Sequence, residues 1–139
     1  MVQLIVGNKG KGKTKILLDK VNTEVKNILG NIVYLDKSTQ HMYELNNKVR
    51  LINVKDYSIE NSDQFTGFVA GIISQDHDLQ QMYFDSFLDI AHLRDQDITS
   101  TLKKLQALSE TFNVDFVLSV SMDEADLPEA AKSMIAVSL

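Results

Sequence analysis

The stretch GNKGKGKT, residues 7–14, follows directly on the apolar run VQLIV, residues 2–6. It reads as Gly, four residues, then Gly-Lys-Thr. Backbone N–H groups can close around an anion only where side chains do not block it, and glycines remove those side chains. The positive N-terminal end of a following helix, a lysine ammonium and a threonine hydroxyl that can ligate Mg²⁺ suit the same anion. The stretch therefore predicts a phosphate-binding loop between a strand and a helix.

These residues resemble the Walker A sequence of P-loop nucleoside triphosphatases. A random chain of this length matches the pattern only about 0.005 times, which argues against a chance Gly- and Lys-rich turn. The resemblance implies a bound nucleoside triphosphate with Mg²⁺, a catalytic role for Lys13 and a metal-ligating role for Thr14. It implies that the nucleotide is bound by Gly7, Asn8, Lys9, Gly10, Lys11, Gly12, Lys13 and Thr14.

Composition limits the classes of protein to consider. The chain of 139 residues has room for one core, so we expect a single P-loop nucleotide-binding domain over 1–139. Its net charge of −5 argues against a nucleic-acid or anionic membrane partner. It contains no cysteine, its N-terminus lacks the order of a signal peptide, and no apolar run could span a bilayer. We therefore expect a cytoplasmic protein.

Apolar residues alternate between short runs typical of buried strands and the three- and four-residue spacing typical of helices. A helix is expected from Lys13 to Leu29, with Gly30 as its C-terminal cap. A right-handed crossover then makes the strand 31–36 parallel to the first. The pattern predicts an α/β fold, a three-layer α/β/α sandwich with a mainly parallel sheet. Further strands are expected at 50–54, 81–85, 115–121 and 134–139, and further helices at 39–45, 62–73, 98–112 and after Pro128.

Two segments of this pattern carry separate expectations. Gly67 and Gly71 lie four residues apart in a predicted helix, and we expect them to allow close packing against the sheet. Residues 86–96 are expected to form a polar, irregular segment.

Asp85 ends an apolar strand and resembles the Walker B aspartate, which implies a catalytic and Mg²⁺-ligating role beside Thr14. Asp36 ends its own strand in the same way and remains the rival ligand. Ser119 or Ser121, on the following strand, resembles the γ-phosphate sensor of the RecA-like branch of P-loop proteins, against the alternative of a serine satisfied by backbone. The RecA-like branch is therefore favoured.

Absent motifs narrow the activity. The guanine-recognition pattern is missing because Arg50 stands where Asn47-Lys48-Val49 would need an acid, so ATP is favoured over GTP. Many ATP-hydrolysing relatives carry Glu directly after Walker B, and this chain has Ser86. The base that orients the attacking water must then be Asp89, Asp36 or Glu124, or else hydrolysis is slow. Arg94 is either a phosphate-contacting finger or a surface residue, and the three histidines show no metal-ligand spacing.

We therefore expect an ATP-binding protein with slow Mg²⁺-dependent hydrolysis, an ATPase. The alternatives are a nucleotide-binding regulatory or assembly module with little hydrolysis and, ranked third, a small-molecule kinase with 86–96 as its lid. A protein partner or a homo-oligomer is left open. The chain also resembles small P-loop proteins of Gram-positive bacteria, some labelled twitching motility ATPase. Retraction motors are much longer and carry motifs absent here, so that label is not adopted as the function.

Overall fold

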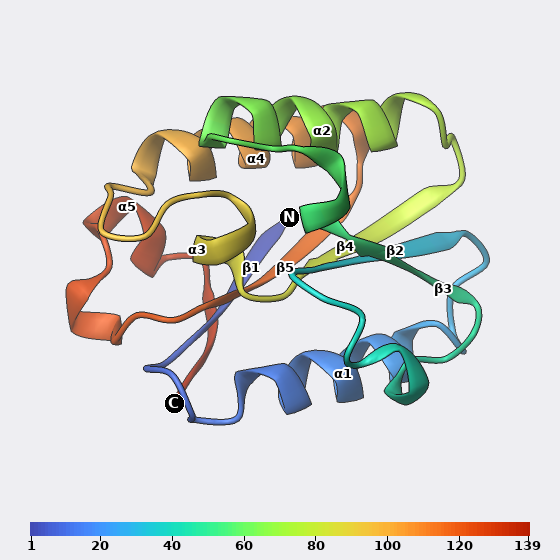
Figure 1. The fold of residues 1–139 in the computed structure, drawn as a ribbon, viewed down its shortest axis with the longest axis horizontal. Coiled ribbons are helices and arrows are strands. Elements are labelled where there is room, and N and C mark those ends of the chain that lie inside the picture. Colours follow the sequence, from blue (N-terminus) through green and yellow to red (C-terminus); the bar gives the residue numbers. More distant parts are fainter.

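The computed structural model describes all residues, 1–139. It is an α/β protein whose six strands form one all-parallel sheet in the order β3-β2-β4-β5-β1-β6. An all-parallel sheet with helices on its faces agrees with the predicted three-layer α/β sandwich (Figure 1). The strands are β1 Val2–Val6, β2 Asn31–Asp36, β3 Val49–Asn53, β4 Leu79–Phe84, β5 Asp115–Val120 and β6 Ile135–Ser138.

Helices cover both faces of the sheet. The helix α1 lies on one face, and α2 and α4 lie side by side on the other (Figure 1). None of the helices combines the length and the apolar composition that crossing a bilayer requires. The α-helices are α1 Lys13–Glu24, α2 Ser62–Ser74, α3 Phe87–Ile90, α4 Thr99–Phe112 and α5 Glu129–Lys132, and the 3-10 turns are η1 Met42–Glu44, η2 Val54–Tyr57 and η3 Glu124–Asp126.

Each strand divides its side chains between two cores, because successive residues point to opposite faces of a sheet. In β2, Val33 and Leu35 pack in the larger core beneath α2 and α4, whereas Ile32 and Tyr34 pack in the smaller core beneath α1. The same alternation holds in β4 and β5. The position of a residue in its strand therefore decides which helical layer it meets.

Three expectations about helices are corrected. The helix α1 ends at Glu24, five residues before the predicted Leu29, and Gly30 is not its cap. A Cβ at Gly30 would lie 2.2 Å from the carbonyl oxygen of Asp78, so this glycine is required by close backbone approach. At 39–45, η1 supplies a single 3-10 turn in place of the predicted helix.

Gly67 and Gly71 do not pack against the sheet. Both are exposed on α2, and a Cβ at either position would meet no atom within 4 Å. The segment 86–96 is also less irregular than expected, because it contains α3. Its apolar residues anchor it in the larger core, and those buried are Phe87, Ile90, Ala91 and Leu93.

Candidate functional site

Three polar side chains form a row at the carboxyl edge of the sheet. Leu35 of β2 pairs with Phe84 of β4, and Phe84 pairs with Leu118 of β5. The next residue along the chain is polar in all three cases. Residues two positions apart in a strand share a face, and the residues two positions earlier pack beneath α1, so these polar side chains also point toward α1. Strand register therefore places three polar groups beside one another under the start of α1: Asp36, Asp85 and Ser119.

The glycine-rich loop connects β1 to α1 at the same edge. Gly10 and Gly12 have φ of 88° and 92°, a left-handed conformation that L side chains rarely adopt. The helix begins immediately afterwards, at Lys13. Its N-terminal N–H groups and the positive end of its dipole face the site, which makes this a position suited to an anion.

Lys13 is only 7 % exposed, and its ammonium donates its one hydrogen bond to the carbonyl oxygen of Asn8 in the loop, at 3.2 Å. Burial lowers the pKa of the Lys13 ammonium, and the nearby Asp85 carboxylate opposes that change. The cation lies between the loop and the carboxylate without forming an ion pair with an acid. It is therefore available to an external anion.

Asp85 collects hydrogen bonds from three elements. The Thr14 hydroxyl donates to Asp85 Oδ1 at 3.1 Å, and the Ser119 hydroxyl donates to the same oxygen at 3.0 Å. The Tyr34 hydroxyl donates to Asp85 Oδ2 at 2.7 Å. Burial, followed by the Asp85 charge, raises the pKa of Tyr34, so this hydroxyl stays a donor. These bonds hold a buried carboxylate in one orientation beside Thr14.

Ser119 links two residues of the site. It donates to Asp85, and its oxygen accepts a hydrogen bond from the backbone N–H of Ser86 at 2.9 Å. Ser86 has φ of 55°, so the chain turns sharply after the Asp85 carboxylate. Ser119 is buried and satisfied inside the protein, whereas Ser121 is exposed and lines the open cavity. The two serines offered as alternatives therefore occupy different environments.

Asp36 is the least satisfied polar group of the site. Its side chain is 2 % exposed, and its Oδ1 accepts from the backbone N–H of Lys37 at 2.7 Å. Its Oδ2 is the one buried side-chain oxygen or nitrogen in the chain that has no hydrogen-bond partner. Burial raises the pKa of Asp36 to about 6, and the Asp85 carboxylate adds to that rise. The site therefore contains a buried acid with no cation in ion-pair contact.

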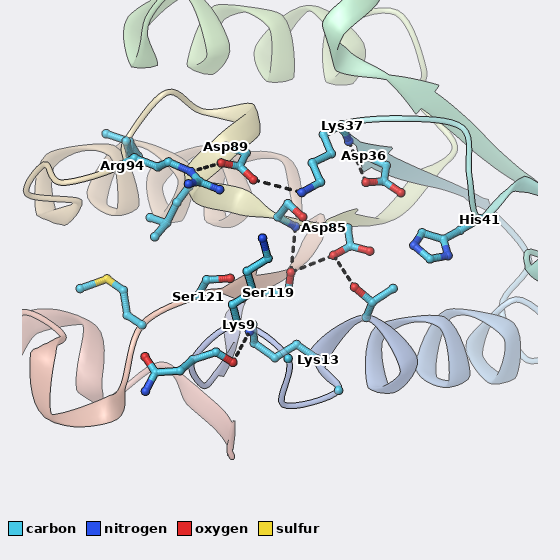
Figure 2. A pocket seen from close by; sticks show the side chains of 18 of the residues that line it. Lys9, Lys13, Asp36, Lys37, His41, Asp85, Asp89, Arg94, Ser119 and Ser121 are labelled. Carbon is cyan, nitrogen blue, oxygen red and sulfur yellow. Dashed lines mark hydrogen bonds and ion pairs between the residues drawn. The ribbon is translucent and has the colours of Figure 1, made fainter.

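Two cations converge on Asp89 at the opposite side of the site. Lys37 contacts Asp89 Oδ2 at 3.4 Å, and Arg94 pairs with Asp89 Oδ1 (Figure 2). The hydrogen bond from Arg94 lowers the pKa of Asp89 most, and Lys37 adds to this effect against the opposing effect of burial. The Arg94 side chain is 66 % exposed. Arg94 therefore lines the cavity at its solvent-exposed rim.

These groups line one open cavity of about 940 Å³. Of the residues predicted for the site, Gly7 and Lys11 do not line it: Gly7 is buried at the end of β1, and Lys11 is exposed to solvent. Glu124, one of the predicted bases, lies outside the cavity as well. The predicted residues that line it are Asn8, Lys9, Gly10, Gly12, Lys13, Thr14, Asp36, Asp85, Asp89, Arg94, Ser119 and Ser121.

Sequence reasoning missed three residues of the site. Tyr34 could have been found, because it lies two positions before Asp36 and must share its face of the sheet. Lys37 could have been found as well, because it directly follows Asp36 in the sequence. His41 had no motif signal, since only the chain path after β2 brings it near the two aspartates.

Comparison with known proteins assigns no family. A scan against models of protein families gave no match, and a search of curated proteins gave none either. The geometry and chemistry of the site are therefore the basis for any functional proposal.

The oxygen atoms beside the loop fit Mg²⁺. The Thr14 hydroxyl and the Asp85 carboxylate lie 3.1 Å apart, and both are hard oxygen ligands of the kind this ion takes, together with water and phosphate oxygens. Thr14 is partly exposed at the cavity, so an ion could reach both groups from there.

Proposed function

We propose that this chain is a P-loop protein that binds a nucleoside triphosphate, ATP in preference to GTP, together with Mg²⁺. The observation that carries the proposal is the hydrogen bond between the Thr14 hydroxyl and Asp85 Oδ1. These residues are 71 positions apart in sequence, yet they meet beside the glycine-rich loop. This is the pairing implied by a Walker A threonine and a Walker B aspartate that share one metal ion.

The chain's own groups would bind the triphosphate electrostatically. The loop N–H groups and the start of α1 would hold the phosphates, and Lys13 would leave Asn8 O to reach their outer oxygens. Bound Mg²⁺ would neutralise phosphate charge. Asp85 would stay in place through its bonds to Tyr34 and Ser119. These residues orient and stabilise the phosphates, and they require no covalent step by the protein.

Slow hydrolysis is part of the proposal. Ser86 occupies the position where many ATP-hydrolysing P-loop proteins carry a glutamate. Asp89 is held as a carboxylate by Lys37 and Arg94, which makes it a weak base. Asp36 is the remaining candidate to orient water, because it is buried at the cavity with one free oxygen. Because the only remaining base has no hydrogen-bond partner to orient its free oxygen, we expect a low rate of hydrolysis.

The position of β5 supports the RecA-like branch. It lies between β4 and β1, and it presents Ser119 next to Asp85. A polar side chain on the strand after Walker B is the feature by which the chain resembles that branch. Because Ser119 bonds Asp85 and Ser86, we propose that it positions the carboxylate, and that Ser121 is the serine free to contact a ligand.

Two other functions have specific support. The weak base favours a regulatory or assembly module in which nucleotide binding itself is the signal. The segment 86–96 lines the cavity and carries Arg94, which with Lys37 could hold a second anionic substrate, as a small-molecule kinase requires. A protein partner or a second copy is compatible with any of these functions. The cysteine-free composition is compatible with a cytoplasmic location.

Equilibrium binding of ATP and GTP with Mg²⁺, followed by phosphate release, tests the proposal. We expect ATP to bind at submillimolar concentration or better, and Lys13→Ala to weaken it about 10-fold or more. Lys15→Ala is the matched control, because this lysine is exposed on α1 and pairs with Asp19. Failure of both nucleotides to bind would contradict the proposal. Binding without release would favour the regulatory module, and release only with an acceptor would favour a kinase.

A second pair of variants tests whether Asp85 or Asp36 is the principal Mg²⁺ ligand. Asp85→Asn should weaken Mg²⁺-dependent ATP binding about 10- to 100-fold, the range for a lost contributor to metal affinity. Asp36→Asn should weaken it less, because Asp85 and not Asp36 bonds the Thr14 hydroxyl. Titrating Mg²⁺ at constant ATP distinguishes the variants, and the reverse order would show that Asp36 is the principal ligand.

A further inference from the structure

Three metal-ligating side chains converge at the edge of the cavity. Asp36, His41 and Asp85 each offer a ligand atom, and these atoms all lie within 4.8 Å of one another. They come from the end of β2, the segment before η1 and the residue after β4. Figure 2 shows the three side chains turned toward a common space beside the loop. The chain path, and not a sequence motif, brings them together.

An unpartnered buried oxygen points to a ligand in this space. Asp36 is 2 % exposed, and its Oδ2 has no hydrogen-bond partner. Leaving a buried charged acceptor unpaired costs more than the 1–3 kcal/mol typical of a neutral group. The Asp85 carboxylate close by adds a second negative charge and contributes to the raised pKa of Asp36. A bound cation would provide the partner for Oδ2 and offset the repulsion between the two acids.

The His41 ring has a polar neighbour at each of its nitrogens. Its Nδ1 lies 3.3 Å from Glu44 Oε1, which resembles the carboxylate–histidine pair that orients an imidazole toward a metal. Its Nε2 lies 3.0 Å from the side-chain amide of Gln40. Gln40 is exposed, so its amide can swing into solvent and free Nε2 for an ion.

Asp85 has the capacity to serve two ions. Its Oδ1 receives the Thr14 and Ser119 hydroxyls, and its Oδ2 receives only the Tyr34 hydroxyl. A carboxylate oxygen has two lone-pair positions, so Oδ2, which does not contact Thr14, has one position left for an ion.

We propose that Asp36, His41 and Asp85 bind a divalent transition-metal ion of the Zn²⁺ and Mn²⁺ class, at a position separate from Mg²⁺ beside Thr14. An imidazole nitrogen with two carboxylates suits such an ion, whereas Mg²⁺ takes oxygen ligands and water. Three protein ligands leave open positions for water or a phosphate oxygen. Binding of this ion does not require a nucleotide, so it stands independently of the function proposed above.

Calorimetric titration of the nucleotide-free protein with Zn²⁺, in the presence of excess Mg²⁺, tests this site. We expect one high-affinity Zn²⁺ per chain, and about 10-fold or greater weakening in both His41→Gln and Asp36→Asn. His77→Gln is the matched control, because His77 is exposed between Asp76 and Asp78 and could bind Zn²⁺ at the surface. That variant should keep the full affinity.

Nuclear magnetic resonance of the wild-type protein gives a second readout that needs no folded variant. Adding Zn²⁺ should shift the ring nitrogens of His41 and leave those of His77 and His92 in place. An unchanged affinity in either site variant, loss of binding in His77→Gln, displacement by excess Mg²⁺, or an unshifted His41 would each overturn the proposal. Nucleotide binding, measured separately, has no bearing on these outcomes.

Discussion

Asp85 is the residue on which the contacts of the site converge. A buried carboxylate is costly unless hydrogen bonds compensate its lost hydration, and here three hydroxyls donate to it. Each hydroxyl comes from a different element, so the carboxylate joins β2, β5 and α1. Its role in folding can therefore be measured without any ligand.

Tyr34→Phe should reduce the free energy of unfolding by about 1.5–3 kcal/mol, the range for a hydrogen bond to a charged group. The substitution removes only the hydroxyl that donates to Asp85 Oδ2 and keeps the ring stacked on Tyr83, with centroids 6.2 Å apart. Urea unfolding measures the difference.

Tyr83→Phe is the matched control in the same ring pair. Its hydroxyl donates to Gln81 Oε1 at 2.8 Å, and Gln81 is only partly buried, so water can replace the bond. We expect a cost of about 1 kcal/mol or less. Equal losses in the two variants would show that Tyr34 does not stabilise the Asp85 charge.

Among the elements, the loop and α1 form part of the candidate site, while the connection between α1 and β2 is fixed by close packing. The chain leaves α1 at Glu24 and reaches β2 through Gly30, whose N–H donates to Gln80 Oε1 at 2.7 Å. There the backbone passes too close to Asp78 for any side chain. Gly30, which the sequence suggests as a helix cap, is instead required where the connection before β2 passes the connection before β4.

Gly30→Ala should lower the stability by about 1–3 kcal/mol, because its Cβ would meet the Asp78 carbonyl oxygen at 2.2 Å and the backbone must shift. Gly71→Ala provides the opposite control on α2, where open space surrounds the position. Replacing this helical glycine should raise the stability by roughly 0.5–1 kcal/mol. Denaturant unfolding that finds both changes neutral would contradict this account of Gly30.

At the scale of the whole molecule, strand order sets the electrostatics. Because β2 and β4 are neighbours, two acids that lie 49 residues apart end on adjacent strands. Neither has a cationic partner in ion-pair contact, and the pKa of Asp36 rises to about 6. The folded protein therefore binds a proton at Asp36 that the unfolded chain releases near pH 4.

Stability should consequently fall as the pH rises from about 4 to about 6, because the folded state holds the proton that the unfolded state has lost. The rise from 3.8 to about 6 corresponds to about 3 kcal/mol at neutral pH. Asp36→Asn should remove this penalty. In chelator and without nucleotide, the variant should be more stable than the wild type above pH 6 by up to that amount.

The two proteins should approach equal stability below about pH 4, where Asp36 is protonated in both states. Asp19→Asn, on the exposed surface of α1, controls for the general effect of removing one charge from a chain of net charge −5. A wild type as stable as Asp36→Asn at neutral pH would show that Asp36 carries no buried charge there.

Much of the fold followed from local pattern. Apolar runs and helical spacing predicted six strands in a mainly parallel sheet, the helices α1, α2 and α4, and the glycine-rich loop that precedes Lys13. The short apolar runs that end in an acid also placed Asp36 and Asp85 at strand ends. These features depend on neighbours in sequence, because backbone geometry and side-chain periodicity decide them.

Only the tertiary structure decided which strands are adjacent, and with them the composition of the site. Placing β4 and β5 between β2 and β1 set Ser119 and Tyr34 against Asp85, and the chain path after β2 brought His41 to the same place. The sequence by itself determined the phosphate-loop pattern and the α/β periodicity. Long-range packing determined which residues meet the loop and Asp85. Contacts between residues far apart in the chain depend on how buried apolar surfaces fit together, and they leave no local pattern.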